Sequence, residues 1–371
     1  MNSGRRTKAI GLMLERIRQT AEEEAPGFPH FADVRTGRWT RSAGGDWTGG
    51  FWVGELWLAA AATRDPWFYD QASNWAGRLQ ARNQADTIFR GFLFWYGAAI
   101  GSITMGDGTA AEIAIDGASR LAGTFNEAAG LMPLGSAAEE AESVGPTETN
   151  IDGVPGVVPL LVWTGRRVSA LEYIDRARLH AIRHIDLCVR NDGSVVQSAS
   201  FDLDSGRTLR RYTHKGLTNE STWTRAQAWA MLGYAQALHW LGEDFRAVAY
   251  RVADWWIEHL PDDGVAWWDF EAPGSLRDTS GTAIAAAALL KLAEGPAGKR
   301  FRDVAEHMVD ALVDRHLTGM HSSRDEVPGI LTDGCYNRRI GLAVANELIW
   351  GDYMLLESLL HLDGVIDTSS L

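Results

Sequence analysis

A single aspartate, Asp152, stands where an apolar helix is expected to begin. It lies in the run TNIDGVP (residues 149–155), directly ahead of the apolar sequence VVPLLVW. An aspartate in this place commonly caps the helix with its carboxylate. A carboxyl group half sunk among apolar side chains is also a suitable general acid, because desolvation raises its pKa toward the working pH of an enzyme. The residues alone leave both interpretations open.

Two cationic residues follow at positions that suit an anionic ligand. Arg225 lies in the run STWTRAQAW (221–229), and a guanidinium turned inward there can hold a carboxylate in a planar fork. The alternative is a structural ion pair, since a buried arginine needs an anion. Lys215, in YTHKG (212–216), either adds positive charge to the same pocket or is a solvated loop lysine.

Aromatic residues are the compositional outlier of this chain. Sixteen tryptophans occur among 371 residues. The flat apolar indole ring, with its single N–H donor, is well suited to stacking on sugar rings. The run DWTGGFW (46–52) places Trp47 beside two glycines, which let a ligand approach the backbone. A helix entry with core aromatics gives the same pattern. Tyr336, in LTDGCYN (331–337), is a candidate for the rim of the pocket.

Several chemistries are disfavoured by motifs that the sequence lacks. It has no phosphate-binding loop, dinucleotide fingerprint, HExxH motif, CxxC pair or serine nucleophile elbow, and no histidine pair has metal-ligand spacing. We therefore expect no metal and no organic cofactor, and hydrolysis by acid and base catalysis comes first. The formal net charge of −13 disfavours nucleic acid and anionic membranes as partners. An acidic ligand then needs a local basic pocket.

The same features predict a cytoplasmic protein. No apolar run approaches the ~18 residues of a membrane span. Residues 1–24 show helical periodicity rather than the long apolar core of a signal peptide. Cys188 and Cys335 are isolated from each other and lack metal spacing, which is typical of a reducing compartment. A monomer and a homodimer both stay open.

Helical periodicity dominates the rest of the chain, and few segments alternate as strands do. A short hairpin is expected within residues 190–222, near a D-S-G turn. About twelve helices fit six helical hairpins closed into a ring, an all-α (α/α)6 barrel that residues 1–371 form as a single domain. Helices are predicted over residues 5–23, 51–63, 66–83, 91–104, 108–122, 152–164, 168–189, 223–241, 243–259, 279–293, 298–315 and 344–362.

In these runs the chain resembles the unsaturated glucuronyl hydrolases, glycoside hydrolase family 88, and more distantly the unsaturated rhamnogalacturonyl hydrolases. The resemblance extends over nearly the whole chain. Its most specific stretches are STWTRAQAWAMLGYAQAL, HLPDDGVAWWDFEAP with the following RDTSGTAIAAAALLKLA, LTDGCYNRR, and ELIWGDYMLLESLLHL. It implies an (α/α)6 barrel with a funnel-shaped pocket.

The resemblance also implies a particular chemistry. Members of that family add water across the C4=C5 double bond of an unsaturated uronic acid, and the resulting hemiketal opens and releases the neighbouring sugar. An aspartate donates a proton to C4 and helps to activate the water, and its position in the motif corresponds to Asp152. Five further residues match family positions that line the pocket: Trp47, Phe92, Trp223, Arg225 and Tyr336.

Four positions depart from the family pattern. The family's usual His-Asp-x-Gly-Phe reads IFRGF here, so that Phe89 stands at the place of a second essential carboxylate. Gln197 and Lys215 replace a pocket histidine and a pocket glutamine, and Asp333 replaces the histidine before Gly-x-Tyr-Asn. Either another carboxylate, such as Asp86 or Asp333, has taken over, or the reaction has changed.

The leading hypothesis is a hydrolase of acidic oligosaccharides that contain unsaturated uronic acid. Asp152 is the expected general acid and base, and Arg225 with Lys215 is expected to hold the anionic group. The alternatives are a saturated glycosidase or a polysaccharide lyase on the same scaffold, both favoured by the missing carboxylate, and a non-catalytic binder of acidic sugars. The leaving sugar, its linkage and its sulfation are not fixed by the sequence.

Overall fold

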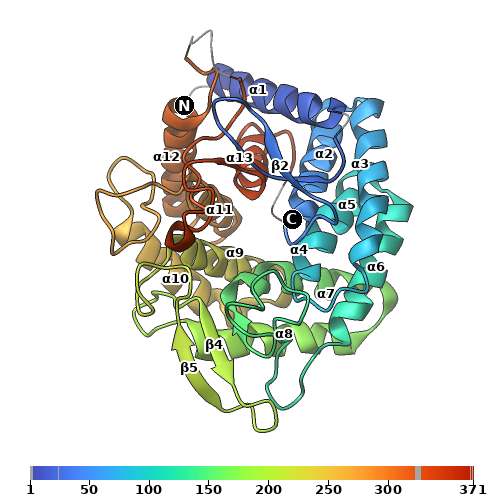
Figure 1. The fold of residues 1–371 in the computed structure, drawn as a ribbon, viewed down its shortest axis with the longest axis vertical. Helices are drawn as coiled ribbons and strands as arrows, with labels where there is room; N and C mark the ends of the chain where they lie inside the picture. The colour runs from blue at the N-terminus through green and yellow to red at the C-terminus, as the bar shows by residue number, and fades with distance from the viewer. Residues whose placement is uncertain (1–2, 24, 322–326, 368, 370) are drawn as a thin grey trace.

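The computed structural model describes residues 3–23, 25–321, 327–367, 369 and 371, and most of these residues are helical. Helices alternate along the chain between an outer layer and an inner ring (Figure 1). The outer helices are α1 (Ser3–Glu22), α3 (Pro66–Leu79), α6 (Gly108–Ala122), α8 (Leu171–Cys188), α10 (Arg246–His259) and α12 (Gly298–His316). The inner segments are α2 (Gly49–Thr63), the continuous run α4 (Arg90–Phe94), η2 (Trp95–Ala99) and α5 (Ile100–Met105), α7 (Val154–Val168), α9 (Thr224–Leu241), α11 (Thr279–Leu292) and α13 (Ile349–Leu362).

The inner segments contact one another in cyclic order. α2 packs on α4 and η2, α4 on α7, α7 on α9, α9 on α11, α11 on α13, and α13 returns to α2. Their composition explains this placement, since every residue of α11 is buried, whereas α8 buries only one face. A helix that is apolar all round needs partners on all sides, and an amphipathic helix needs them on one. The predicted helices are therefore confirmed in their order.

Two small three-stranded sheets accompany the helical ring. One has the order β3 (Thr149–Asn150), β4 (Ser198–Phe201) and β5 (Thr208–Tyr212), all antiparallel, and it contains the hairpin predicted within 190–222. The other has the order β2 (Trp39–Ser42), β1 (Phe28–Ala32) and β6 (Glu347–Leu348), and it was not predicted. Single 3₁₀ turns complete the described elements: η1 (Gln80–Arg82), η3 (Ile151–Gly153), η4 (Glu243–Phe245) and η5 (Arg338–Ile340).

Four helices begin two or more residues later than predicted. The outer helices α8 and α10 begin at Leu171 and Arg246 rather than at residues 168 and 243, and the other two are inner helices. α7 begins at Val154 rather than at residue 152, because β3 and the turn η3 precede it. α13 begins at Ile349 rather than at residue 344, because β6 pairs with β1 first. In both places the chain enters an inner helix from a short strand, so a sheet rather than the helix itself positions the entering residues.

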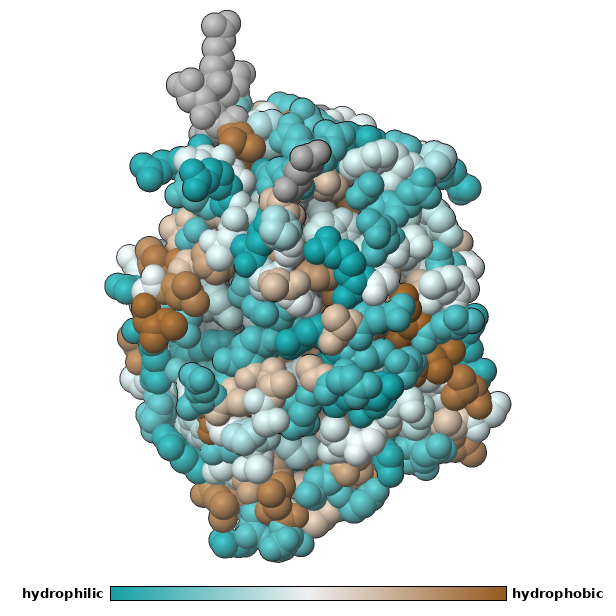
Figure 2. Space-filling view, turned by 45° about the vertical axis from the view of Figure 1, so that its right-hand side comes forward, coloured by the Kyte–Doolittle hydropathy of each residue, from teal (hydrophilic) through white to brown (hydrophobic). Residues whose placement is uncertain are grey.

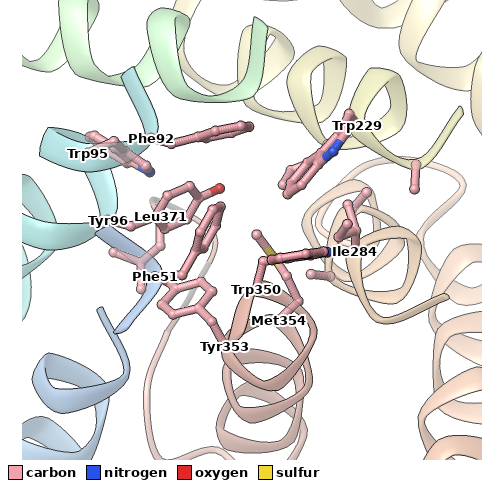
Figure 3. Packing of buried hydrophobic residues seen from close by; sticks show 14 of the residues in the cluster. Phe51, Phe92, Trp95, Tyr96, Trp229, Ile284, Trp350, Tyr353, Met354 and Leu371 are labelled. Atoms are coloured by element: carbon pink, nitrogen blue, oxygen red, sulfur yellow. The ribbon is translucent and has the colours of Figure 1, made fainter. Parts of the chain in front are cut away.

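Aromatic side chains fill the centre of the ring (Figure 3). The rings of Phe92 and Trp229 face each other with centroids 4.9 Å apart, and Phe51 stacks on Tyr96 at 4.5 Å. The side chain of Leu371 reaches the same cluster. On the surface shown in Figure 2, hydrophobic side chains form separate groups among hydrophilic ones. None of the described helices combines the length and the hydropathy needed to cross a bilayer.

The inner helices α4 and α7 approach so closely that only glycine fits between them. A Cβ atom on Gly91 would lie 2.7 Å from the backbone of Gly156 and Val157, and one on Gly156 would lie 2.5 Å from the backbone nitrogen of Phe92. Backbone atoms cannot move aside as a flexible side chain can. This contact sets the start of α4 beside the turn η3, which carries Asp152.

We expect Gly156→Ala to lower the free energy of unfolding by about 1 to 3 kcal/mol, because the added methyl group forces two packed helices apart. Gly77→Ala, on the outer helix α3, is the matched control. A Cβ atom there meets nothing within 4 Å, so this variant should gain up to about 1 kcal/mol from helix propensity. Urea denaturation measures both, and equal effects of the two substitutions would contradict the proposed close contact.

Candidate active site

The turn η3 presents Asp152 from the end of a strand. β3 pairs with β4 so that Asn150 lies opposite Ser198, and the backbone N–H of Ile151 donates to the carbonyl of Gln197 at 2.9 Å. Asp152 thereby lies beside Gln197, whose side-chain Nε2 donates to Asp152 Oδ2 at 3.1 Å. The backbone N–H of Lys215 donates to the other end of the same amide, Oε1, at 3.1 Å. The amide of Gln197 is thus oriented with its donor toward Asp152.

Burial makes Asp152 a weak acid. The residue is 5% exposed, and this desolvation raises the pKa of its carboxyl to about 6, while the hydrogen bond from Gln197 and the positive charge of Arg225 oppose the rise. Its Oδ1 has no hydrogen-bond partner within the described part of the chain. No side chain caps α7, so the interpretation of Asp152 as a helix cap is wrong. Near neutral pH this carboxyl can both give and take a proton.

Lys215 is buried and paired, so the alternative of a solvated loop lysine is wrong. The residue is 5% exposed, and its Nζ binds Oε1 of Glu140. The ammonium lies 5.3 Å from the ring centroid of Tyr336 and 5.6 Å from that of Trp223, within the range of a cation–π contact. Burial lowers the pKa of Lys215 well below its usual range, and the carboxylate of Glu140 favours its charged form.

Glu140 is the site carboxylate that the sequence did not single out. It is 7% exposed, and its Oε2 accepts a hydrogen bond from Nδ2 of Asn150 at 2.8 Å and lies 3.2 Å from Nε2 of His214. Burial lowers the pKa of His214 to about 4, so this imidazole is neutral at pH 7. The segment that carries Glu140 lies between α6 and β3 and has no periodicity, and Glu139 and Glu142 are close by in sequence. No local signal separates Glu140 from them.

The guanidinium of Arg225 forms hydrogen bonds to other groups of the protein. Its guanidinium donates to Asp278 Oδ2 at 3.2 Å and to the carbonyl oxygens of Cys335 and Tyr336, and it stacks over the ring of Trp223 at 4.3 Å. The structural ion pair considered from the sequence is therefore present. Arg225 also forms part of the cavity wall, where its positive charge acts on any anion that enters.

The aromatic wall joins residues from several inner segments. Trp47 donates from its indole Nε1 to the hydroxyl of Tyr336 at 3.2 Å. Phe89 stacks on Phe92, with centroids 5.9 Å apart and ring planes 9° apart. Trp229 lies four residues after Arg225 on α9 and therefore shares its helix face. Phe89 thus supplies an apolar ring at the position where the sequence resemblance implies a carboxylate.

The structure brings the predicted site residues together around two adjoining cavities. The outer cavity has a volume of about 520 Å³ and includes Tyr336 in its wall, whereas the inner one has about 10 Å³. Glu140 and Lys215 line both. Gln197 stands behind Asp152 through its hydrogen bond. The inner cavity is lined by Trp47, Phe89, Phe92, Glu140, Asp152, Lys215, Trp223, Arg225 and Trp229.

The two aspartates considered as substitutes for the missing carboxylate lie elsewhere. Asp86 Oδ2 accepts hydrogen bonds from the backbone N–H and the hydroxyl of Ser136 at 2.9 and 2.8 Å. Asp333 Oδ2 is bound to Nδ1 of His316 at 2.8 Å, and its side chain is 48% exposed. Neither residue lines the inner or the outer cavity described above. Glu140 is the carboxylate that accompanies Asp152 in the inner cavity.

Comparison with known proteins gives consistent results over most of the chain. The chain is 34% identical to the unsaturated glucuronyl hydrolase of Bacillus sp. (strain GL1), with 96% of each chain covered. The crystal structure of the enzyme from Bacillus sp. GL1 matches with a TM-score of 0.89 at 32% identity and covers 96% of both chains. An unsaturated chondroitin disaccharide hydrolase of Streptococcus pneumoniae is 27% identical and covers 76% of this chain and 72% of its own. The model of Glycosyl Hydrolase Family 88 matches residues 21–343, and the chain therefore belongs to that family of glycoside hydrolases.

Proposed function

We propose that this enzyme hydrates the C4=C5 double bond of an unsaturated uronic acid at the end of an acidic oligosaccharide and so releases the neighbouring sugar. One observation carries the proposal: Asp152, with a pKa of about 6, lies in an aromatic-lined cavity beside the buried pair of Lys215 and Glu140. The names of the similar proteins, unsaturated glucuronyl hydrolase and unsaturated chondroitin disaccharide hydrolase, support the same substrate class.

The reaction needs one group that changes its protonation state. Protonated Asp152 gives its proton to C4, and the electrons of the double bond form the new C4–H bond, which leaves positive charge at C5 and the ring oxygen. A water molecule then forms a bond from its oxygen to C5, and the ionised Asp152 takes a proton from that water. The resulting hemiketal opens by breaking the bond between C5 and the ring oxygen. The hemiacetal left at C1 then releases the neighbouring sugar.

The other site residues hold the substrate in this scheme. Lys215, with Arg225 adding positive charge, binds the uronate carboxylate. The rings of Trp47, Phe92 and Trp223 form the inner wall on which the sugar packs, and Tyr336 contacts the next sugar at the rim. Gln197 positions Asp152.

The proposal extends to the architecture and the setting of the enzyme. The cyclic contacts of the inner helices support a single (α/α)6 barrel formed by the whole chain. Cys188 and Cys335 are both buried and free, which supports a reducing, cytoplasmic location.

A second candidate is β-elimination on an intact uronide. Burial lowers the pKa of Lys215, and a neutral amine beside the cation Arg225 suits a base that takes the C5 proton. The C4–O bond then breaks, and the oxygen of the departing sugar takes a proton from Asp152. This reaction forms the double bond that hydration consumes, so a single absorbance measurement separates the two candidates.

The first test follows the ultraviolet absorbance of the conjugated C4=C5 double bond. We expect the wild-type enzyme to lower this absorbance with lyase-generated unsaturated disaccharides. Asp152→Asn should lose at least ~100-fold in rate while it still binds the sugar, because an amide cannot supply the proton. Asp175→Asn, at an exposed position on α8, is the control and should match the wild type. Rising absorbance with an intact uronide would instead establish elimination.

A second test concerns the pH dependence of kcat/KM. Hydration needs protonated Asp152, so kcat/KM should fall as the pH rises through about 6. The hydrogen bond from Gln197 stabilises the ionised carboxylate and lowers its pKa. Gln197→Met should therefore raise that pKa and move the falling limb to higher pH by roughly one unit. Gln236→Met, at a buried glutamine on α9 outside the cavity lining, should leave the limb in place. A limb unmoved by Gln197→Met would show that another group controls it.

A further inference from the structure

The ion pair of Glu140 and Lys215 forms the partition between the two cavities. Both side chains line the outer cavity of about 520 Å³, which has room for a sugar, and the inner cavity of about 10 Å³. A volume near 10 Å³ corresponds to about one water molecule. The inner cavity with this pair in place therefore cannot take a uronic acid ring, and part of its wall must move before Asp152 can reach C4.

Glu140 belongs to the part of the wall that can move at the least cost. Phe92, Trp223 and Trp229 belong to inner helices or to their first turns, where close packing resists displacement. Glu140 instead lies on the connection between α6 and β3, in a stretch bounded by Gly135 and Gly145, both with positive φ. Backbone hydrogen bonds hold the turn itself, since the N–H groups of Ser143 and Val144 donate to the carbonyl of Glu140. The glutamate side chain has several rotatable bonds, so a change of rotamer can withdraw its carboxylate without moving a helix.

The groups around the Glu140 carboxylate form a complete binding site for a carboxylate. One oxygen binds the ammonium of Lys215, and the other accepts from the amide of Asn150 at 2.8 Å. A uronic acid presents the same chemical group. Beside it, Asp152 Oδ1 and Asn150 Oδ1 are buried and lack hydrogen-bond donors within the described residues. Hydroxyl groups of a sugar supply donors of this kind.

We propose that Glu140 is an internal stand-in for the substrate carboxylate, and that a uronate must displace it from Lys215 in order to bind. This inference rests on the proposed function and assigns a specificity-determining residue to it. A neutral sugar brings no anion to replace Glu140 and leaves the partition closed. The site accepts a uronate because one carboxylate is exchanged for another at the same cation.

Binding is tested without turnover in the Asp152→Asn background, by calorimetry with a lyase-generated unsaturated disaccharide and with its methyl ester. Glu140→Gln keeps the size of the side chain and removes the competing charge. We expect its Kd for the uronate to fall about tenfold, which matches the loss of one charge-assisted hydrogen bond. Lys215→Gln should weaken uronate binding by at least about tenfold and abolish the preference for the acid over the ester.

Two further variants make the outcome decisive. Glu127→Gln removes an exposed carboxylate from the same connection and should leave both Kd values unchanged. Glu140→Asp shortens the side chain while keeping its charge, and it should give an intermediate Kd if Glu140→Gln does not fold. Unchanged or weaker uronate binding in a folded Glu140 variant would overturn the inference. A second result would also overturn the inference. If Glu140→Gln in the otherwise wild-type enzyme lowers kcat by at least ~100-fold and leaves Kd unchanged, Glu140 takes part in the reaction itself.

The failure of this inference is distinguishable from the failure of the proposed function. If the wild-type enzyme turns over the unsaturated disaccharide but Glu140→Gln leaves its affinity unchanged, only the role of Glu140 is lost. If the wild-type enzyme neither turns over nor binds an unsaturated uronide, the proposed function fails and the stand-in role fails with it.

Discussion

Arg225 and Asp278 form a fully buried ion pair, and the mouth of the site depends on it. Arg225 comes from α9, and Asp278 caps α11 by accepting hydrogen bonds from the first N–H groups of that helix. Two charges removed from water are tolerated only when their remaining bonding groups are satisfied. The guanidinium therefore also binds the carbonyls of Cys335 and Tyr336, and Asp278 accepts from the N–H of Cys335. Tyr336 is thereby held where its hydroxyl meets the indole of Trp47, so one pair fixes both the loop and the aromatic wall.

The features that could be predicted from the sequence are those with a local signal. α9 was predicted over residues 223–241 and spans Thr224–Leu241, because a helix that is apolar all round has few other interpretations. Asp152 was singled out because a carboxylate directly ahead of an apolar run is expected to be buried, and burial in the structure raises its pKa as expected. The sheet that joins β1 to β6 had no such signal, because β6 contributes two residues and pairs with a strand near the other end of the chain.

The contacts that no local pattern specifies were missed or left open. Glu140 meets Lys215 across 75 positions of sequence, and a glutamate in an aperiodic segment gives no indication of its partner. The structure settles two alternatives by burial: Lys215 is enclosed rather than solvated, and Arg225 is committed to Asp278. The sequence also could not predict which carboxylate lies in the cavity beside Asp152. Asp86 and Asp333 were candidates by charge alone, and the hydrogen bonds that hold them outside the cavity depend on the fold.

The apolar side chain of Phe89, at a position where the family resemblance implies a second carboxylate, is compatible with the proposed hydration because of the charge balance in the cavity. The resting site holds two neutral pairs, Lys215 with Glu140 and Arg225 with Asp278, and the single carboxyl of Asp152. A uronate that replaces Glu140 keeps this balance, whereas a second fixed carboxylate would repel it. In the proposed mechanism the productive form of Asp152 is the protonated, neutral one, and this carboxyl becomes negative as positive charge develops at C5. The one group whose pKa of about 6 lies near neutrality therefore supplies the negative charge at the step that needs it.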